Sequence, residues 1–119
     1  MTTFLPLRVT WQVRQGADFD VSYVWSSGSP ALAVDMSGWA WRLQARSRPS
    51  SALLVDWSSD DDLVVTLGAH GAIGVHVDGA VTAGWSWGQA VADLDLLDGA
   101  RVVPFLRADI VVVPAVVHV

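Results

Sequence analysis

Apolar and polar residues alternate with a period of two along most of the chain, and Gly, Pro, Ser and Asp interrupt the alternation. This pattern is typical of β-strands, because successive side chains of a strand point to opposite faces of a sheet. We therefore expect strands at residues 9–13, 19–25, 39–46, 52–57, 63–67, 73–77, 89–97 and 100–107, together with a short apolar run at 32–36 and a Val-rich last segment at 109–119.

Local signals between the strands predict how they are connected. Residues 78–88 contain three glycines, which disfavour a full helix, so we expect a loop there with at most one helical turn. Asp98-Gly99 is the strongest hairpin signal, because a two-residue turn requires the positive φ that Gly and Asp tolerate. The strands on either side of it should pair antiparallel. Pro114 cannot donate to a sheet ladder and indicates a strand edge or a bend.

About eight short strands, with little or no helix, predict an all-β fold. An antiparallel β-sandwich, immunoglobulin-like or related, is the favoured architecture over a barrel. The 119 residues correspond to one average domain, so we expect a single domain over 1–119 with short arms at 1–6 and 114–119. No repeat of 20–50 residues indicates a solenoid or a propeller.

Composition excludes several classes of chemistry. The chain has 12 acidic and 7 basic residues, none of them Glu or Lys, and no Cys, which gives a formal net charge of -5. Disulfides, thiolate metal sites and lysine-based catalysis are therefore excluded. The acidic balance argues against nucleic acid as a partner. No apolar run reaches the roughly 18 residues of a membrane span, and the N-terminus does not resemble a signal peptide, so we expect no membrane partner and no export.

Candidate catalytic and metal-binding groups do not form a known motif. The three histidines, His70, His76 and His118, lack the spacing of metal ligands, and residues 60–62 lack the spacing of a calcium loop. Asp93 and Asp95 lie about 7 Å apart on one strand face by strand geometry, which a glycosidase could use, but exposed acids beside a core stripe are far commoner. No Gly-x-Ser-x-Gly elbow or phosphate-binding loop is present. We therefore expect no catalytic residues, no cofactor and no metal.

Seven Trp are the unusual feature of the composition. Four of them, Trp11, Trp25, Trp39 and Trp41, fall on strand faces that we predict to point inward, where large rings fill a core. Trp85 and Trp87 differ, because they lie in the sequence GWSWG, which is typical of a loop. A Trp in a loop plugs the end of a core or anchors a protein partner. Stacking on carbohydrate is a third alternative.

Several strands are apolar on both faces, which predicts a protein interface. The alternative is closure of a half-barrel that buries both faces. We also expect the terminal arms to reach a partner, with the two loop Trp as anchors. The predicted interface residues are Phe4, Leu5, Val24, Leu54, Val64, Trp85, Trp87, Val102, Leu106, Val116, Val117 and Val119.

Six segments, taken together, resemble a β-sandwich domain of tailed bacteriophages. They are residues 14–19 (RQGADF), 33–39 (AVDMSGW), 42–46 (RLQAR), 53–56 (LLVD), 87–96 (WGQAVADLDL) and 111–114 (VVVP). Their order and spacing match over roughly residues 8–116. The family occurs as the N-terminal domain of baseplate upper proteins and tail-fibre proteins, and as small stand-alone virion proteins. The resemblance implies a structural role in a symmetric phage assembly, and the family has no catalytic residues to transfer.

No coiled coil, collagen-like repeat or receptor-binding module follows the domain in this sequence, so we expect a small tail or baseplate component. A capsid decoration (head accessory) protein is the alternative. Expected partners are other virion proteins, namely tail, baseplate or capsid subunits, and further copies of the chain within the particle. The expected location is the virion, assembled in the host cytoplasm. A carbohydrate-binding module and a small hydrolase are the hypotheses from other classes.

Overall fold

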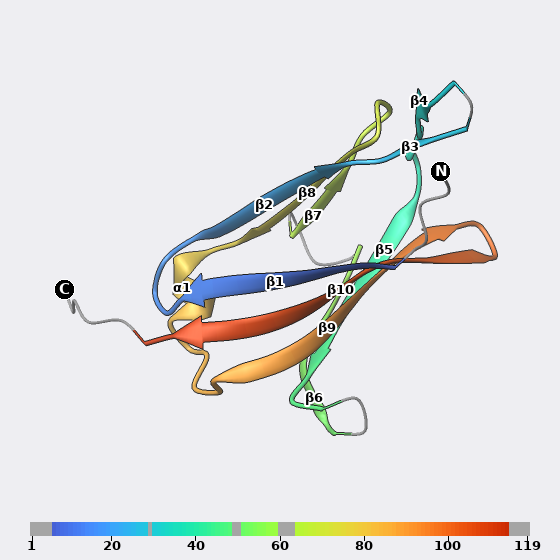
Figure 1. The fold of residues 1–119 in the computed structure, drawn as a ribbon. Helices are drawn as coiled ribbons and strands as arrows, with labels where there is room; N and C mark the ends of the chain where they lie inside the picture. The colour runs from blue at the N-terminus through green and yellow to red at the C-terminus, as the bar shows by residue number, and fades with distance from the viewer. Residues whose placement is uncertain (1–5, 29, 49–50, 60–63, 115–119) are drawn as a thin grey trace.

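The computed structural model describes residues 6–28, 30–48, 51–59 and 64–114, and confirms an all-β, sandwich-like fold (Figure 1). The single helical turn, α1, spans Gly79–Thr82, within the loop where the sequence allowed at most one turn. The strands are β1 (Leu7–Arg14), β2 (Phe19–Val24), β3 (Ser26–Ser27), β4 (Leu32–Ala33), β5 (Ala40–Arg46), β6 (Leu53–Ser58), β7 (Val65–Leu67), β8 (Ala72–Val77), β9 (Gln89–Asp98) and β10 (Arg101–Val113).

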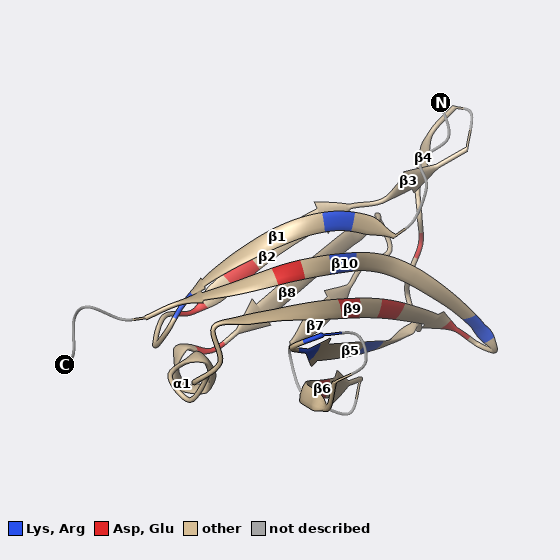
Figure 2. Cartoon of the chain, turned by 60° about the horizontal axis from the view of Figure 1, so that its bottom comes forward, with Lys and Arg blue, Asp and Glu red and all other residues tan. Residues whose placement is uncertain are grey.

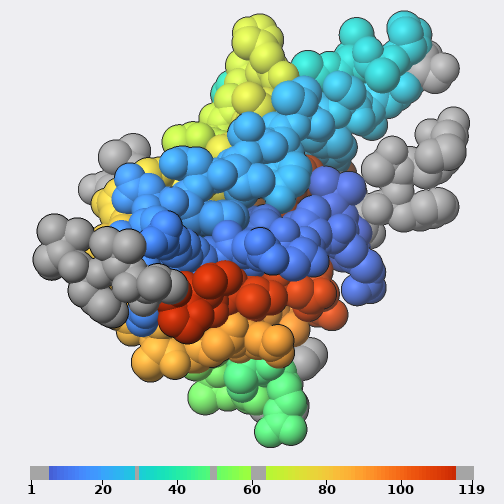
Figure 3. Space-filling view, turned by 60° about the vertical axis from the view of Figure 1, so that its left-hand side comes forward, coloured from blue at the N-terminus to red at the C-terminus, as the bar shows by residue number. Residues whose placement is uncertain are grey.

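Two sheets form the two layers of the sandwich. The larger sheet has the strand order β1-β10-β9-β5-β6, and the smaller one has the order β2-β8-β7. The short β3-β4 ladder forms a loop that projects from one end of the molecule (Figures 1 and 3). The surface of β1 lies between the surfaces of β2 and β10, so both ends of the chain contribute to one side of the sandwich (Figure 3).

One strand pair corrects the expectation of a wholly antiparallel sandwich. β1 and β10 pair in parallel, from Leu7 opposite Leu106 to Arg14 opposite Val113, whereas the other paired strands are antiparallel. The reason is that β1 does not form a hairpin with the next strand in the sequence. The turn after Arg14 leads into β2 of the opposite sheet, and the position beside β1 is taken by the last strand, which runs in the same direction.

The core lies between the two sheets. Inward side chains of β8 and β9 are almost fully buried, as the alternation predicts: Ile73, Val75 and Val77 on β8, and Ala90, Ala92, Leu94 and Leu96 on β9. Trp11 and Trp41 are buried too, in agreement with their predicted inward position. Trp25 and Trp39 are half-buried just outside the strands and pack edge to face, with ring centroids 6.0 Å apart.

Leu106 is the predicted interface residue that the structure contradicts, because it is 1% exposed. The register of β10 against β9 shifts between Pro104 and Leu106, so Phe105 is an extra residue in the ladder. A β-bulge of this kind reverses the alternation beyond it. Both Phe105 and Leu106 are therefore buried in the core, and Pro104 lies at the bulge, where the missing N–H is tolerated.

The end of the chain also differs from the expected segmentation. The predicted strands at 100–107 and 109–119 are one continuous strand, β10, which ends at Val113 before Pro114. The β9-β10 hairpin pairs Asp98 with Arg101, so its turn residues are Gly99 and Ala100, one position later than predicted. The predicted arm residues Phe4, Leu5, Val116, Val117 and Val119 lie outside the described residues.

Candidate functional site

The outer face of the larger sheet is organised by ion pairs. The Arg107 guanidinium donates to both carboxylate oxygens of Asp93, at 2.8 and 3.1 Å. Arg42 makes the equivalent pair with Asp56, at 3.3 and 3.2 Å. Hydrogen bonds from Arg42 lower the pKa of Asp56, whereas burial, reinforced by Asp93, raises the pKa of Asp95. Acidic and basic positions lie side by side on β9 and β10 (Figure 2), so the centre of this face is polar rather than an apolar patch.

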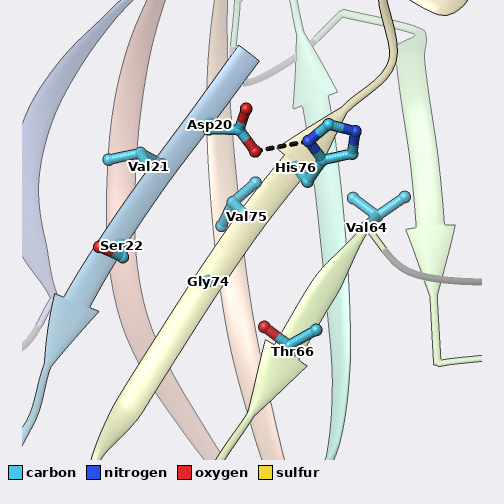
Figure 4. Close-up of a pocket in the computed structure, with 8 residues that line it drawn as sticks. All are labelled: Asp20, Val21, Ser22, Val64, Thr66, Gly74, Val75 and His76. Carbon is cyan, nitrogen blue, oxygen red and sulfur yellow. Dashed lines mark hydrogen bonds and ion pairs between the residues drawn. The ribbon is translucent and has the colours of Figure 1, made fainter. Parts of the chain in front are cut away.

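A groove of about 370 Å³ crosses the outer face of the smaller sheet (Figure 4). It is open because Gly74, in the middle of β8, has no side chain: a Cβ there would lie 2.7 Å from the Thr66 hydroxyl. The groove is lined by Asp20, Val21 and Ser22 of β2, Gly74, Val75 and His76 of β8, Thr66 of β7 and Val64. Its most polar end is formed by Asp20 and His76, which face each other in the β2-β8 register.

Two carboxylates hold the His76 imidazole. Nδ1 lies 2.5 Å from Oδ1 of Asp20, and Nε2 lies 2.7 Å from Oδ1 of Asp78. Hydrogen bonds to Asp20 and then to Asp78 raise the pKa of His76 from 6.5 to about 9. At pH 7 the ring is therefore an imidazolium that donates from both nitrogens.

We expect an NMR titration of metal-free protein to give a His76 pKa of about 9, and Asp20→Asn to lower this pKa. Folding raises the pKa of His76. The stabilisation of the fold by its contacts with Asp20 and Asp78 is therefore complete below pH 6.5 and is lost as the pH rises through about 9. The unfolding free energies of the wild type and of His76→Gln should therefore converge at high pH. Asp109→Asn, on the opposite sheet, is the matched control and should leave the His76 titration unchanged.

A third carboxylate completes this cluster. Asp18 lies in the turn between β1 and β2, and its Oδ1 accepts a hydrogen bond of 2.6 Å from the backbone N–H of Gly79. The ligand atoms of Asp18, His76 and Asp78 all lie within 4.8 Å of one another. His76 was not predicted to bind a metal, because its spacing from the other histidines matches no ligand motif. The position of Asp78 two residues after His76 in the sequence was a usable signal, whereas the approach of Asp18 and Asp20 depends on topology.

The predicted interface residues do not form one surface. Val24 and Val102 are exposed, at 74% and 58%, and lie at the same end of the sandwich. Tyr23 and Trp25, on either side of Val24, both contact the ring of Phe105, with ring centroids 6.1 and 5.8 Å apart. Phe105 is three residues along β10 from Val102.

Leu54 is 39% exposed but lies elsewhere. Its neighbour Leu53 pairs with Arg46 of β5, and Arg46 pairs in turn with Val91 of β9. Val102 pairs with Leu97 of the same strand, six residues from Val91. That separation is about 20 Å along the strand. Val64 is half-buried against the core.

Trp85 and Trp87 are half-buried and pack on each other, with ring centroids 4.8 Å apart and planes 31° apart. Trp85 also stacks on Trp57 of β6, at 6.2 Å and 27°. Both loop Trp pack against the core, and Trp85 borders a residual cavity of only about 10 Å³. Of the three roles considered for Trp85, this packing favours closure of the end of the core over binding to a protein partner or to carbohydrate.

Leu32 is an exposed residue that was not among the predicted interface residues. It lies on β4 in the projecting loop, opposite Ser27, and is 70% exposed. The apolar run at 32–36 predicted a strand, but only Leu32 and Ala33 pair in a ladder, while Met36 is fully buried. A ladder of two residues is too short for the alternating pattern that would show that Leu32 is exposed.

In the described part of the chain, no helix has the length and apolar character needed to cross a membrane. No protein-family model and no curated protein matches this chain. Its function has therefore to be inferred from the fold, from the groove with its imidazolium end, and from the exposed aliphatic side chains at the opposite end.

Proposed function

We propose that this chain is a non-enzymatic structural protein of a tailed-bacteriophage virion, which docks onto a symmetric particle assembly as a small tail or baseplate component. The observation that carries the proposal is the group of exposed aliphatic residues Val24, Leu32 and Val102, which we call the docking end. Each is more than half exposed, at 74%, 70% and 58%. Val24 lies on the outward face of β2 and Val102 on the outward face of β10, in opposite sheets, so a neighbouring protein that contacts all three residues would cover the end of the sandwich.

The shape of the molecule supports docking through this end. The loop with Leu32 projects beyond the two sheets, beside the end of β2 that carries Val24 (Figure 1). The β9-β10 hairpin, whose second strand carries Val102, extends at the same end (Figure 1). A specific contact requires about 800 Å² on each partner, more than these three side chains provide, so the flanking polar residues would form the rim. Contacts between neighbouring copies on a particle would raise the overall avidity without a change in the affinity of each contact.

Two of the groups considered for catalysis, His76 and Asp93, are held by ion pairs, which supports a non-enzymatic role. Both ring nitrogens of His76 face carboxylates and its pKa is about 9, so the ring is protonated at pH 7 and is not a free general base. Asp93, one of the two carboxylates considered for a glycosidase, is held by two hydrogen bonds from Arg107.

The test is co-sedimentation of the purified protein with phage particles that lack it. Val24→Ser combined with Leu32→Ser and Val102→Ser should weaken binding by about tenfold or more, equivalent to about 1.4 kcal/mol. The matched control combines Val81→Ser with Val113→Ser, which are each 43% exposed and lie on α1 and at the end of β10. This control should bind as the wild type does.

Separate head and tail fractions distinguish the two virion locations. Binding to tails supports the tail or baseplate role, and binding to heads alone supports the alternative of a capsid decoration protein. Failure of the wild type to bind either fraction, or an equal loss in the control variant, would contradict docking through this end.

A further inference from the structure

The end of the sandwich that carries α1 brings together three groups with metal-ligand chemistry. Asp18 comes from the turn between β1 and β2, His76 from the end of β8, and Asp78 from the residue before α1. One ligand atom from each lies within 4.8 Å of the others. Their side chains are exposed or half-buried, so a hydrated ion can reach them. This site is distinct from the docking end and does not depend on it.

The backbone that carries these ligands is fixed by contacts outside the cluster. Thr82 of α1 is fully buried, and its hydroxyl accepts a 3.0 Å hydrogen bond from the Gly16 N–H and donates one of 2.8 Å to the Ala17 carbonyl. Gly79 fits closely against the same turn, since a Cβ there would lie 2.6 Å from the Gly16 oxygen. The β1-β2 turn and α1 are therefore held together, and the ligands need little rearrangement to bind an ion.

The imidazole is already oriented for a metal. Asp20, which is outside the three-residue group, holds Nδ1 at 2.5 Å, and Nε2 faces Asp78. Histidine ligands of metals almost always donate the second ring N–H to a carboxylate or carbonyl in this way, which fixes the ring and the tautomer. Binding would release the Nε2 proton to solvent and form a bond from the ion to Nε2 in its place.

The chemical nature of the three ligands indicates which metal ion the cluster would bind. One imidazole nitrogen and two carboxylate oxygens suit Zn²⁺, which takes His at about 2.0–2.1 Å and Asp at about 2.0–2.2 Å in a four-coordinate site. Calcium requires about 6–8 oxygen ligands, and Mg²⁺ prefers an all-oxygen shell. We propose that Asp18, His76 and Asp78 bind a divalent transition-metal ion of the zinc type, with Asp20 as the positioning residue and water as the fourth ligand.

The test is titration of the untagged full chain, freed of metal by a chelator, with Zn²⁺ at pH 8, followed by isothermal calorimetry. We expect one ion per chain and an upward shift in Tm that grows with Zn²⁺ concentration. His76→Gln and Asp78→Asn should each reduce the affinity by about 10-fold or more, and Asp20→Asn should reduce it by about 10–100-fold through loss of ring orientation. Mg²⁺ and Ca²⁺ should bind more weakly than Zn²⁺.

His70→Gln and Asp98→Asn are the matched controls, because both residues are exposed and lie outside the cluster. They should bind Zn²⁺ as the wild type does, and far-ultraviolet circular dichroism should show that all variants are folded. The proposal is wrong if the wild type gives no saturable Zn²⁺ binding, or if the controls lose as much affinity as the ligand variants. Co²⁺ in place of Zn²⁺ gives a second readout, since its visible absorption should appear with the wild type and not with His76→Gln.

Discussion

Replacing Phe105 by alanine is expected to lower the free energy of unfolding by about 3–5 kcal/mol. The side chain is 1% exposed, and its ring contacts the rings of Tyr23 and Trp25 across the two sheets. Truncation removes a buried aromatic ring and leaves a cavity. The cavity closes only in part, because β10 is hydrogen-bonded to β1 on one side and to β9 on the other. Equilibrium unfolding in urea, followed by Trp fluorescence, measures the loss.

Val102→Ala is the matched control for this variant, because Val102 lies on the same strand and is 58% exposed. Its effect on the free energy of unfolding should stay within about 0.5 kcal/mol. The control also separates stability from docking, since it should keep the fold while weakening particle binding. An unfolding free energy of Phe105→Ala close to that of Val102→Ala would contradict the assignment of Phe105 to the core.

The strands and most of the core follow from the sequence because alternation is a local signal. His76 on β8 and Asp93 and Asp95 on β9 each lie between two buried residues, so the inward face can be identified without knowledge of the partner strand. The eight predicted strands correspond to β1, β2, β5 to β9 and the first half of β10. Trp11 and Trp41 were placed in the core by the same reasoning.

The bulge in β10 shows where a local signal fails. An extra residue at Phe105 reverses the faces of all later residues, and nothing in the alternating pattern marks its position except Pro104. Leu106 was consequently assigned to solvent although it is buried. The parallel pairing of β1 with β10 is also invisible locally, because it joins segments that lie about 100 residues apart.

The two candidate sites were predictable to different degrees. Val24 and Val102 were identified because each is an apolar residue on the polar side of its strand, and both are exposed. The spacing of His76 and Asp78 was visible in the sequence, but the complete cluster was not, since Asp18 and Asp20 approach His76 only when β2 pairs with β8. A site assembled from separate strands carries no spacing motif in a single sequence.

Gly71→Ala is expected to lower the free energy of unfolding by about 2–5 kcal/mol, from two separate causes. Gly71 has a φ of +80°, which costs an L-residue about 1–2 kcal/mol. An added Cβ would also overlap the carbonyl oxygen of Trp25, and such overpacking costs about 1–3 kcal/mol. Trp25 cannot move away freely, because its N–H donates to the Gly71 oxygen at 2.8 Å. Urea unfolding measures the loss.

Gly38→Ala separates the two causes. Gly38 has a nearly identical φ of +77°, but a Cβ there meets no atom within 4 Å, so only the conformational cost of about 1–2 kcal/mol applies. The difference between the two variants therefore measures the close approach of Gly71 to Trp25. Because Trp25 begins the projecting loop that carries Leu32, Gly71→Ala should also weaken particle binding at temperatures where it is folded. Equal stability losses in the two variants would show that the close approach of Gly71 to Trp25 adds nothing to the cost of the substitution.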